Sequence, residues 1–449
     1  MTGRSGGRPP RVAIWGHYHG GNLGDEVVVS TIAANLRRRL PSVSLVGVSQ
    51  SPRDTEERHG MPALPLRWAA ERLTSGGPPQ HPTGSKVKER LTKRSDHRGV
   101  REARRLAARV RDLGAEAAFL RRSLQRLDDI DLIVVAGSGP VSDDWRGPWS
   151  HPYTIFKWSL LARLKGVPFA FLGVGAGPID HRLSRYLLAG PLRWAAFRSV
   201  RDEASADLVR GLGVRGPMSV VPDLAISLPV PDGGWPRPGA TDGQVRVGLN
   251  PIPYMDRRYW PAVDDERYAA YVAKVADYAE WVLTGGRRLV FVYSQTGVDP
   301  LVCDDVLALL AERLDPALLE QVERPLIDTV DDLLEALAGC DYVVAGRFHC
   351  ILLPYLIGRP AIGMSYHAKT DALMDYMGQS DLCFDVDAFS AADLVSASQR
   401  VEQSTEDIGD VVGERLPALR ATLSDHYEHL IDTVGLARDD TTQRAFSAT

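Results

Sequence analysis

A glycine-rich segment near the N-terminus, Gly20–Glu26 (GGNLGDE), carries residue types that suit an anion-binding loop. Glycines at Gly21 and Gly24 let the backbone approach a ligand closely, and a helix beginning here would present unpaired N–H groups. Asn22 and Asp25 add polar side chains. The same residues also fit a tight strand-to-helix turn in which Asp25 only caps the helix. The spacing differs from G-x-G-x-x-G and no Lys-Ser/Thr follows, which disfavours a dinucleotide site or a P-loop.

A second chemically capable pair, Arg347 and His349, follows the apolar segment DYVVAG. An arginine there can hold a carboxylate or phosphate through two parallel hydrogen bonds, and a histidine can move a proton near neutral pH. The alternative is that Arg347 pairs with an acidic neighbour and His349 bonds a backbone carbonyl. Because ligands bind at the carboxyl ends of parallel strands, the position favours a functional role for the pair.

Further candidates share a place just after an apolar, strand-like segment; they are Gly137, Ser138, Gly139, Arg201, Asp202, Tyr366 and Lys369. The glycine-serine-glycine triplet indicates a second permissive loop or a plain turn. For Arg201 and Asp202 two interpretations are open: an internal ion pair that braces a strand end, or contact with a substrate. Lys369, close to Tyr366, is an anion-contact candidate on the same side as Arg347.

The elements that position these residues form an α/β pattern. A strand at Arg11–Trp15, a helix at Val27–Leu40 and a strand at Ser44–Val48 make a βαβ unit. The later apolar segments that indicate strands are Leu132–Ala136, Pro168–Leu172, Ala196–Val200, Ser219–Val221, Val245–Asn250, Leu289–Ser294, Tyr342–Ala345 and Ala361–Ser365. Such alternation predicts two Rossmann-like α/β domains with parallel sheets that face a cleft.

Changes in composition along the chain predict the domain boundaries. Residues 1–228 form an N-terminal domain with a basic helical insertion at about 71–127. Prolines and glycines crowd residues 229–240 and mark a linker. Residues 241–385 form a C-terminal domain, and residues 386–449 are predicted as helices followed by a frayed tail.

Bulk composition excludes several classes of protein. The net charge of −4 argues against a dedicated nucleic-acid binder, which needs basic residues to neutralise phosphates. The 4 cysteines lie singly, without C-x-x-C spacing, which indicates neither a zinc site nor a disulfide framework. No apolar run approaches the roughly 18–20 residues needed to cross a bilayer, so we expect a cytoplasmic protein. H-E-x-x-H and G-x-S-x-G are absent, which disfavours the hydrolases that carry them.

Five blocks taken in order resemble the polysaccharide pyruvyltransferase family: WGHYHGGNLGDE; VVAGSGPVSDD; GVPFAFLGVGAGPI; SVRDEASADLVRGLGV with VVPDLAISLP; and AGRFHCILLPYLIGRPAIGMSYHAK. They span roughly residues 12–375. The resemblance implies a glycosyltransferase-B-like architecture and transfer of the pyruvyl group of phosphoenolpyruvate onto a sugar, giving a cyclic ketal and releasing phosphate. It implies that Asn22, Gly24 and Asp25 line the cleft, and that Arg347 and His349 lie at the donor site.

We therefore expect a transferase that acts in the synthesis of a cell-envelope or exported glycan, uses phosphoenolpyruvate as the donor and needs no metal or other cofactor. His349 would transfer the proton, Asp25 would deprotonate the acceptor hydroxyl and Arg347 would stabilise the departing phosphate. The acceptor, a sugar or a lipid-linked glycan, is expected on the N-terminal domain and the donor on the C-terminal domain. The basic insertion suggests peripheral contact with the inner membrane face. Two alternatives stay open: a nucleotide-sugar-dependent glycosyltransferase of the same architecture, and a catalytically inactive binding relative.

Overall fold

The structure is a computed structural model, and it describes residues 8–16, 21–68, 70, 112, 114–144, 147–229, 231, 243–260 and 262–436. Most of the expected insertion at about 71–127, most of the expected linker at 229–240 and the tail after residue 436 lie outside the described residues. Contacts divide the chain into two compact units, of which the first comprises residues 1–19, 39–219 and 430–449 and the second residues 20–38 and 220–429. Within the described ranges, no helix is both long enough and apolar enough to cross a membrane.

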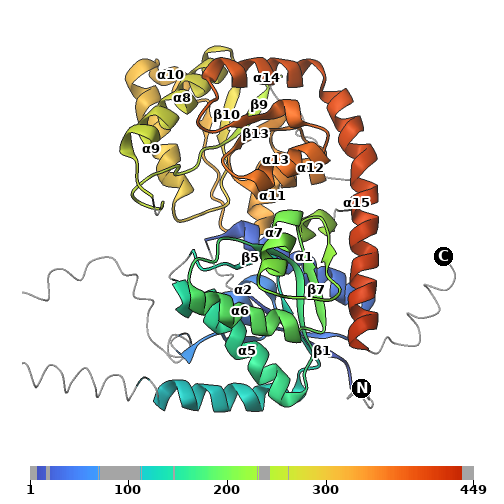
Figure 1. Cartoon of the computed structure of the whole chain (residues 1–449). Coiled ribbons are helices and arrows are strands. Elements are labelled where there is room, and N and C mark those ends of the chain that lie inside the picture. The colour runs from blue at the N-terminus through green and yellow to red at the C-terminus, as the bar shows by residue number, and fades with distance from the viewer. Residues whose placement is uncertain are drawn as a thin grey trace, which may run out of the picture. The chain divides into compact units, whose positions relative to one another are not determined.

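The first unit is built on a sheet with the strand order β3-β2-β1-β4-β6-β7-β8, and β5 pairs with β6 (Figure 1). Its core includes the fully buried side chains of Trp15, Trp158 and Phe171. The strands are β1 Arg11–Trp15, β2 Ser44–Ser49, β3 Ala63–Pro65, β4 Leu132–Val135, β5 Ser138–Val141, β6 Phe169–Ala176, β7 Phe197–Val200 and β8 Ser219–Val220. The helices are α2 Pro52–His59, α5 His151–Lys165, α6 Arg182–Trp194 and α7 Glu203–Gly211, with 3₁₀ turns η2 Leu127–Asp129 and η3 Gly147–Trp149.

Strand β6 is longer than the sequence suggested, since it continues through the glycine run and ends at Ala176. Gly173 has φ 56°, and the register with β7 shifts between Phe171 and Val174. A glycine accepts this left-handed conformation without a Cβ penalty, so the strand bends at a bulge and then resumes. The backbone N–H of Gly173 donates to Ser199 Oγ at 2.8 Å, which ties the bulge to β7.

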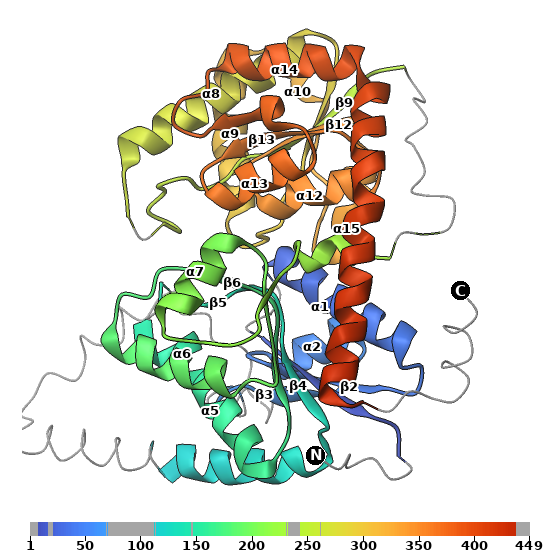
Figure 2. The same cartoon turned by 45° about the vertical axis from the view of Figure 1, so that its right-hand side comes forward.

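The second unit contains a six-stranded parallel sheet with the order β11-β10-β9-β12-β13-β14 (Figure 2). Buried Tyr271, Tyr278 and Phe291 contribute to its core. The strands are β9 Arg246–Asn250, β10 Arg288–Phe291, β11 Val322–Glu323, β12 Tyr342–Ala345, β13 Ala361–Ser365 and β14 Cys383–Asp385. The helices are α1 Leu23–Arg39, α8 Asp265–Thr284, α9 Asp299–Arg313, α10 Pro316–Leu319, α11 Val330–Ala338, α12 Phe348–Leu356, α13 Ala368–Tyr376, α14 Ala391–Gln403 and α15 Thr405–Val434, with 3₁₀ turns η4 Leu224–Ser227 and η5 Ser380–Leu382. The end of α15 from residue 430 onward belongs to the first unit.

Helix α1 connects β1 to β2 of the first unit, yet residues 23–38 belong by their contacts to the second unit. Asn35 Nδ2 donates to the carbonyl oxygen of Ser227 at 3.1 Å and to its Oγ at 3.2 Å. The helix begins at Leu23, before the predicted start at Val27, and its first turn contains Asp25. A helix favours acidic side chains there, because its N-terminus carries a partial positive charge. Part of the predicted glycine loop is therefore helical.

Candidate active site

His349 stands in the first turn of α12 and lies directly against the backbone of Gly24 in α1. A Cβ atom added to Gly24 would be 2.2 Å from His349 Nδ1 and 2.9 Å from its Cε1, much closer than side-chain atoms approach one another. Only glycine leaves this space for the imidazole ring. The glycine segment and the Arg-x-His segment are thus in direct contact within the second unit.

The chain that follows β10 holds the start of α1 in place. The carbonyl oxygen of Gly21 accepts from the backbone N–H of Thr296 at 3.0 Å, and the N–H of Leu23 donates to the carbonyl oxygen of Ser294 at 2.8 Å. Gly21 has φ 119°, a conformation that other residue types rarely adopt. Because the N–H of Leu23 already has a partner, the helix start offers fewer free donors to an anion than the sequence suggested.

The Asp25 carboxylate is fixed by a neighbour from the same segment. Asn22 Nδ2 donates to Asp25 Oδ2 at 2.7 Å. The two side chains are three residues apart, so the bond forms across the first turn of α1. The polar groups that the sequence singled out in the glycine segment therefore hold each other in one orientation.

Asp223 faces the His349 ring from η4. Its Oδ1 lies 4.0 Å from His349 Nε2, and the two side chains are 7% and 13% exposed. The same carboxylate accepts from the backbone N–H of Ala225 at 3.0 Å, where it caps η4. A buried carboxylate therefore lies opposite the outer nitrogen of the His349 ring.

Arg347 is held by a buried carboxylate, as one of the two interpretations of the sequence anticipated. Its Nη2 lies 2.6 Å from Oδ1 of Asp299, and its Nε lies 3.1 Å from the same oxygen. Asp299 is fully buried at the start of α9, and the Arg347 side chain is 9% exposed. Burial alone would lower the pKa of Arg347, but the Asp299 carboxylate outweighs burial and raises it. The backbone N–H of Arg347 donates to Asn250 Oδ1 at 2.8 Å, so the end of β9 also fixes this residue.

Aromatic side chains surround Arg347. The guanidinium carbon lies 5.3 Å from the ring centroid of Tyr259, within the range of a cation–π contact. Burial raises the pKa of Tyr259, which keeps its phenol neutral. Trp260 packs edge-on against Tyr366 with ring centroids 5.4 Å apart. Lys369 Nζ lies 5.5 Å from the ring centroid of Phe348, so this lysine adjoins the Arg-x-His segment.

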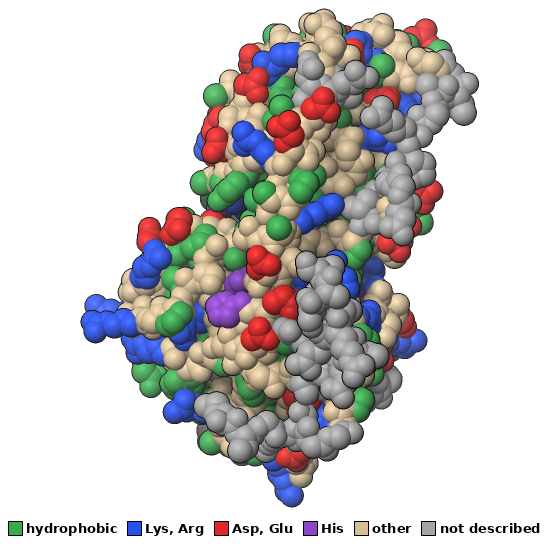
Figure 3. Space-filling model, turned by 90° about the vertical axis from the view of Figure 1, so that its right-hand side faces the viewer, with side chains coloured by type: hydrophobic (Ala, Val, Ile, Leu, Met, Phe, Trp, Pro, Cys, Tyr) green, Lys and Arg blue, Asp and Glu red, His purple; other side chains and the backbone are tan. Residues whose placement is uncertain are grey.

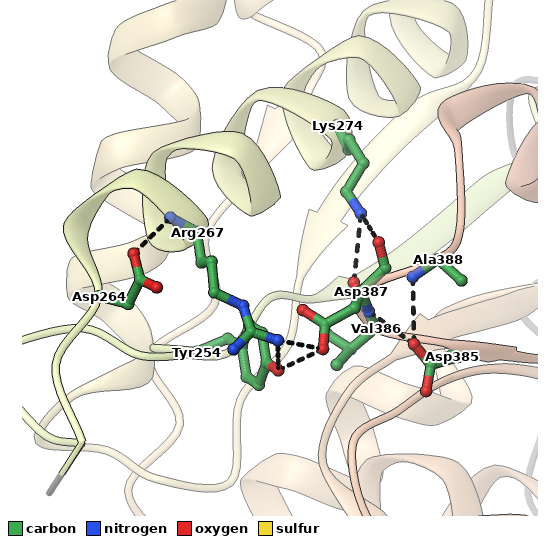
Figure 4. Close-up of polar contacts among 8 residues, drawn as sticks. All are labelled: Tyr254, Asp264, Arg267, Lys274, Asp385, Val386, Asp387 and Ala388. Atoms are coloured by element: carbon green, nitrogen blue, oxygen red, sulfur yellow. Dashed lines mark hydrogen bonds and ion pairs between the residues drawn. The ribbon is translucent and has the colours of Figure 1, made fainter.

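A cluster of polar side chains, drawn in Figure 4, fixes the loop after β9 that carries Tyr259 and Trp260. Tyr254 Oη donates to Asp387 Oδ2 at 2.9 Å, and Arg267 of α8 makes an ion pair with the same carboxylate. Lys274 Nζ donates to the backbone oxygen of Asp387 at 3.1 Å. Burial and the Asp387 carboxylate raise the pKa of Tyr254 to about 12, so it remains a donor. The segment after β9 is therefore tied to α8 and to the segment after β14, and Tyr254 packs on Trp260 with ring centroids 5.6 Å apart.

The other predicted residues belong to the first unit. The segment Gly137–Gly139 is not simply a loop, because β5 begins at Ser138 and pairs with β6. The last pair between β4 and β6 joins Val135 to Phe171, and β6 continues beyond it. In this continuation β6 pairs with β5, which supplies hydrogen-bond partners for its buried backbone groups. Arg201 Nε lies 3.3 Å from Asp202 Oδ2.

Asp202 caps α7, because its Oδ1 accepts from the backbone N–H of Ser205 at 2.7 Å. Burial opposes ionisation of this carboxyl group, but hydrogen bonds from Ser205 and the charge of Arg201 outweigh it and lower the pKa. The contacts of Asp202 are thus those of a brace and helix cap. They match the ion-pair interpretation of the sequence, which was left open beside a substrate role.

Sequence reasoning missed Asp223, Asp299 and the aromatic pair Tyr259 and Trp260 as members of this site. Asp223 was visible as a charged residue at a strand end, which is a usable signal. Asp299 precedes Pro300 at a helix start and looks like an ordinary first-turn residue. Its role depends on the approach of α9 to the end of β12, which no local pattern records.

The chain resembles known proteins in sequence and in fold. The family model described as polysaccharide pyruvyl transferase matches residues 22–368. The amylovoran biosynthesis protein AmsJ of Erwinia amylovora is 21% identical over 415 residues, which cover 89% of this chain and 93% of that protein. MnaA of S. aureus, solved with UDP, is 10% identical with a TM-score of 0.53, covering 95% of this chain and 98% of that one.

The likeness in fold and the two parallel sheets confirm the predicted architecture of two Rossmann-like α/β domains, which is glycosyltransferase-B-like. The family match extends over most of the sequence that forms both sheets and includes Asn22, Gly24, Asp25, Arg347 and His349. The chain belongs to the polysaccharide pyruvyl transferase family.

Proposed function

We propose that this protein transfers the pyruvyl group of phosphoenolpyruvate to a sugar of an exported or cell-envelope glycan and forms a ketal. Family membership and the likeness to a biosynthesis protein of the polysaccharide amylovoran support this reaction class. The observation that carries the mechanism is the position of His349, which contacts Gly24 and faces Asp223. A histidine held between a helix start and a carboxylate is suited to proton transfer.

The proposed reaction conserves atoms and electrons. The methylene carbon C3 of phosphoenolpyruvate gains a proton and becomes a methyl group, and C2 takes on positive character. One sugar hydroxyl oxygen bonds to C2, the bond from C2 to the phosphate oxygen breaks, and a second hydroxyl oxygen closes the ketal. Of the two hydroxyl protons, one replaces the proton given to C3 and the other leaves with phosphate. No oxidant or reductant is needed.

We assign the proton delivered to C3 to His349, and Asp223 stabilises its charged form. Asp25 accepts the proton of the attacking hydroxyl, and Asn22 orients its carboxylate. Arg347 contributes positive charge for the departing phosphate. Because Asp299 holds its Nε and Nη2, this contribution comes through the charge of the guanidinium group and not through two parallel hydrogen bonds to the phosphate.

The protein is proposed to work in the cytoplasm, where thiols stay reduced. Cys303, Cys340, Cys350 and Cys383 are all free, which fits a reducing compartment. The reaction then draws on phosphoenolpyruvate within the cell, and the acceptor is a sugar or lipid-linked glycan.

The test uses the purified chain with phosphoenolpyruvate and a panel of glycosides that carry adjacent or 1,3-related hydroxyl pairs. Phosphate release and the mass of the acceptor are followed together. We expect equal amounts of phosphate and of an acceptor that has gained a pyruvate ketal, and we expect Asp25→Asn and His349→Ala to lose most of this turnover. Sugar transfer from a nucleotide sugar, with phosphoenolpyruvate inert, would identify a glycosyltransferase instead. Binding of phosphoenolpyruvate without turnover on any acceptor would indicate an inactive relative.

A further inference from the structure

Two neighbouring helices of the first unit, α5 and α6, contain basic residues and no acidic residue. Lys157 and Lys165 of α5 pair with Glu116 and Asp128 from other segments, so the surface charge considered below is that of the arginines. The sequence of α5, HPYTIFKWSLLARLK, and that of α6, RLSRYLLAGPLRW, contain Lys and Arg but neither Asp nor Glu. The helices pack against each other, and they lie side by side in Figures 1 and 2. In Figure 3, Lys and Arg side chains interspersed with hydrophobic ones line the left-hand margin of this unit.

Large apolar side chains stand exposed on the same helices and on the adjoining turn η3. Their exposed fractions are 64% for Trp149, 67% for Leu164, 41% for Leu183, 72% for Tyr186 and 37% for Trp194. Leu183, Tyr186 and Trp194 follow a helical spacing that places them along one stripe of α6. Contiguous exposed apolar side chains mark interaction surfaces more often than scattered ones do. We call these five residues, together with the arginines described next, the α5–α6 surface.

The arginines of the α5–α6 surface are Arg163, Arg182, Arg185 and Arg193. Arg163 lies over the ring of Trp194, with its guanidinium carbon 5.3 Å from the centroid. Arg185 and Arg193 donate to backbone oxygens at the C-terminal end of α7, at 3.1 Å to Gly211 and 2.9 Å to Leu212. These partners are neutral, so the bonds hold the two guanidinium groups at the surface without cancelling their charge. On the nearby helix α7, Glu203 and Asp207 pair with Arg210.

We propose that the α5–α6 surface docks the protein on the anionic face of a lipid bilayer. Tyr and Trp side chains favour the boundary between headgroups and acyl chains, where one end of the ring is apolar and the other polar. Leucines add buried apolar area, and each arginine near an anionic membrane strengthens binding roughly fivefold. A bilayer fits this mixture better than an acidic protein or polysaccharide does, because only the bilayer takes up both the apolar stripe and the cationic rim. The inference does not depend on the proposed reaction.

The experiment measures co-sedimentation of the full chain with vesicles of phosphatidylcholine alone and of phosphatidylcholine with phosphatidylglycerol, at low and high salt. We expect binding only to the anionic vesicles, weakened by salt. The double variant Leu183→Ser/Tyr186→Ser should bind at least about tenfold more weakly, and Arg182→Gln about fivefold more weakly. The matched control is Leu326→Ser/Tyr376→Ser, which removes side chains that are 79% and 57% exposed on the second unit and should bind as the unmodified protein does.

Thermal unfolding of each variant checks that the fold is intact, and because the substituted side chains are exposed, we expect unchanged unfolding. The proposal is overturned if the unmodified protein does not bind anionic vesicles, if Leu183→Ser/Tyr186→Ser binds no more weakly than the control, or if an acidic polysaccharide binds in place of vesicles. Because the assay contains neither phosphoenolpyruvate nor acceptor, its result is independent of the proposed reaction. An inactive protein that binds vesicles would leave this inference in place, and an active protein that ignores them would refute it.

Discussion

Replacing Gly24 by alanine puts a methyl group into the space that His349 occupies. The added carbon would be 2.2 Å from Nδ1, whereas carbon and nitrogen atoms in contact are about 3.5 Å apart. The imidazole must therefore move by about 1 Å or turn away. A misplacement of about 1 Å in a reacting group can cost about 10²-fold in rate. We expect Gly24→Ala to lower kcat by about that factor and to change the KM for phosphoenolpyruvate little.

The fold should survive this substitution. Gly24 lies in α1, where alanine is preferred over glycine by up to about 1 kcal/mol, which offsets part of the cost of crowding. Gly413→Ala is the matched control, since it adds the same methyl group to a glycine of α15 that has open space around it. Steady-state kinetics and urea unfolding of both variants separate a catalytic loss from a loss of stability.

A double-mutant cycle identifies the cause. If the methyl group acts by displacing His349, then Gly24→Ala/His349→Ala should be no slower than His349→Ala alone, because the displaced ring is already missing. Additive losses would show that Gly24 acts through something other than this ring. Turnover of Gly24→Ala equal to that of Gly413→Ala would refute the reasoning altogether.

Three further predictions concern buried ionisable side chains. Asp299→Ala leaves the charge of Arg347 buried without its partner, so we expect a loss of about 3–5 kcal/mol in the free energy of unfolding by urea; a loss below about 1 kcal/mol would contradict it. Asp223→Asn keeps a side-chain oxygen for the cap but removes the charge facing His349, and kcat should fall about 10²-fold with an altered pH profile; an unchanged kcat would exclude that role. Burial lowers the pKa of His426 to about 4, while the unfolded chain titrates near 6.5, so the unfolded state binds the proton first as pH falls. The stability that neutral His426 contributes is full above pH 6.5 and is lost as pH falls toward 4, about 3 kcal/mol in all. In His426→Gln, the free energy of unfolding should therefore change less between about pH 7 and about pH 5 than it does in the unmodified protein. An equally large change in both proteins would show that His426 is not its origin.

The sequence by itself determined the fold class and most of the second sheet. The strands at Tyr342–Ala345 and Ala361–Ser365 have the predicted bounds, because short apolar runs between glycine or charged residues are local signals of buried parallel strands. It also singled out Gly24 and His349, because glycine and histidine at element ends have few common roles. Short strands such as β5 and β14 were not predicted, since their pairing depends on an available edge of a neighbouring strand.

Only the tertiary structure decided which residues meet. Helix α1 follows β1 directly in sequence, yet its contacts with Ser227, Ser294 and His349 place it in the second unit. The ion pair between Arg347 and Asp299 was one of two alternatives that the sequence left open. The sequence did not indicate which acidic residue would be the partner of Arg347. Both outcomes depend on contacts between segments far apart in the chain. The local sequence pattern determines the periodicity of helices and strands and where they end. The partner of a buried charge is determined by packing instead, because an unpaired buried charge costs more free energy than local conformational preferences contribute.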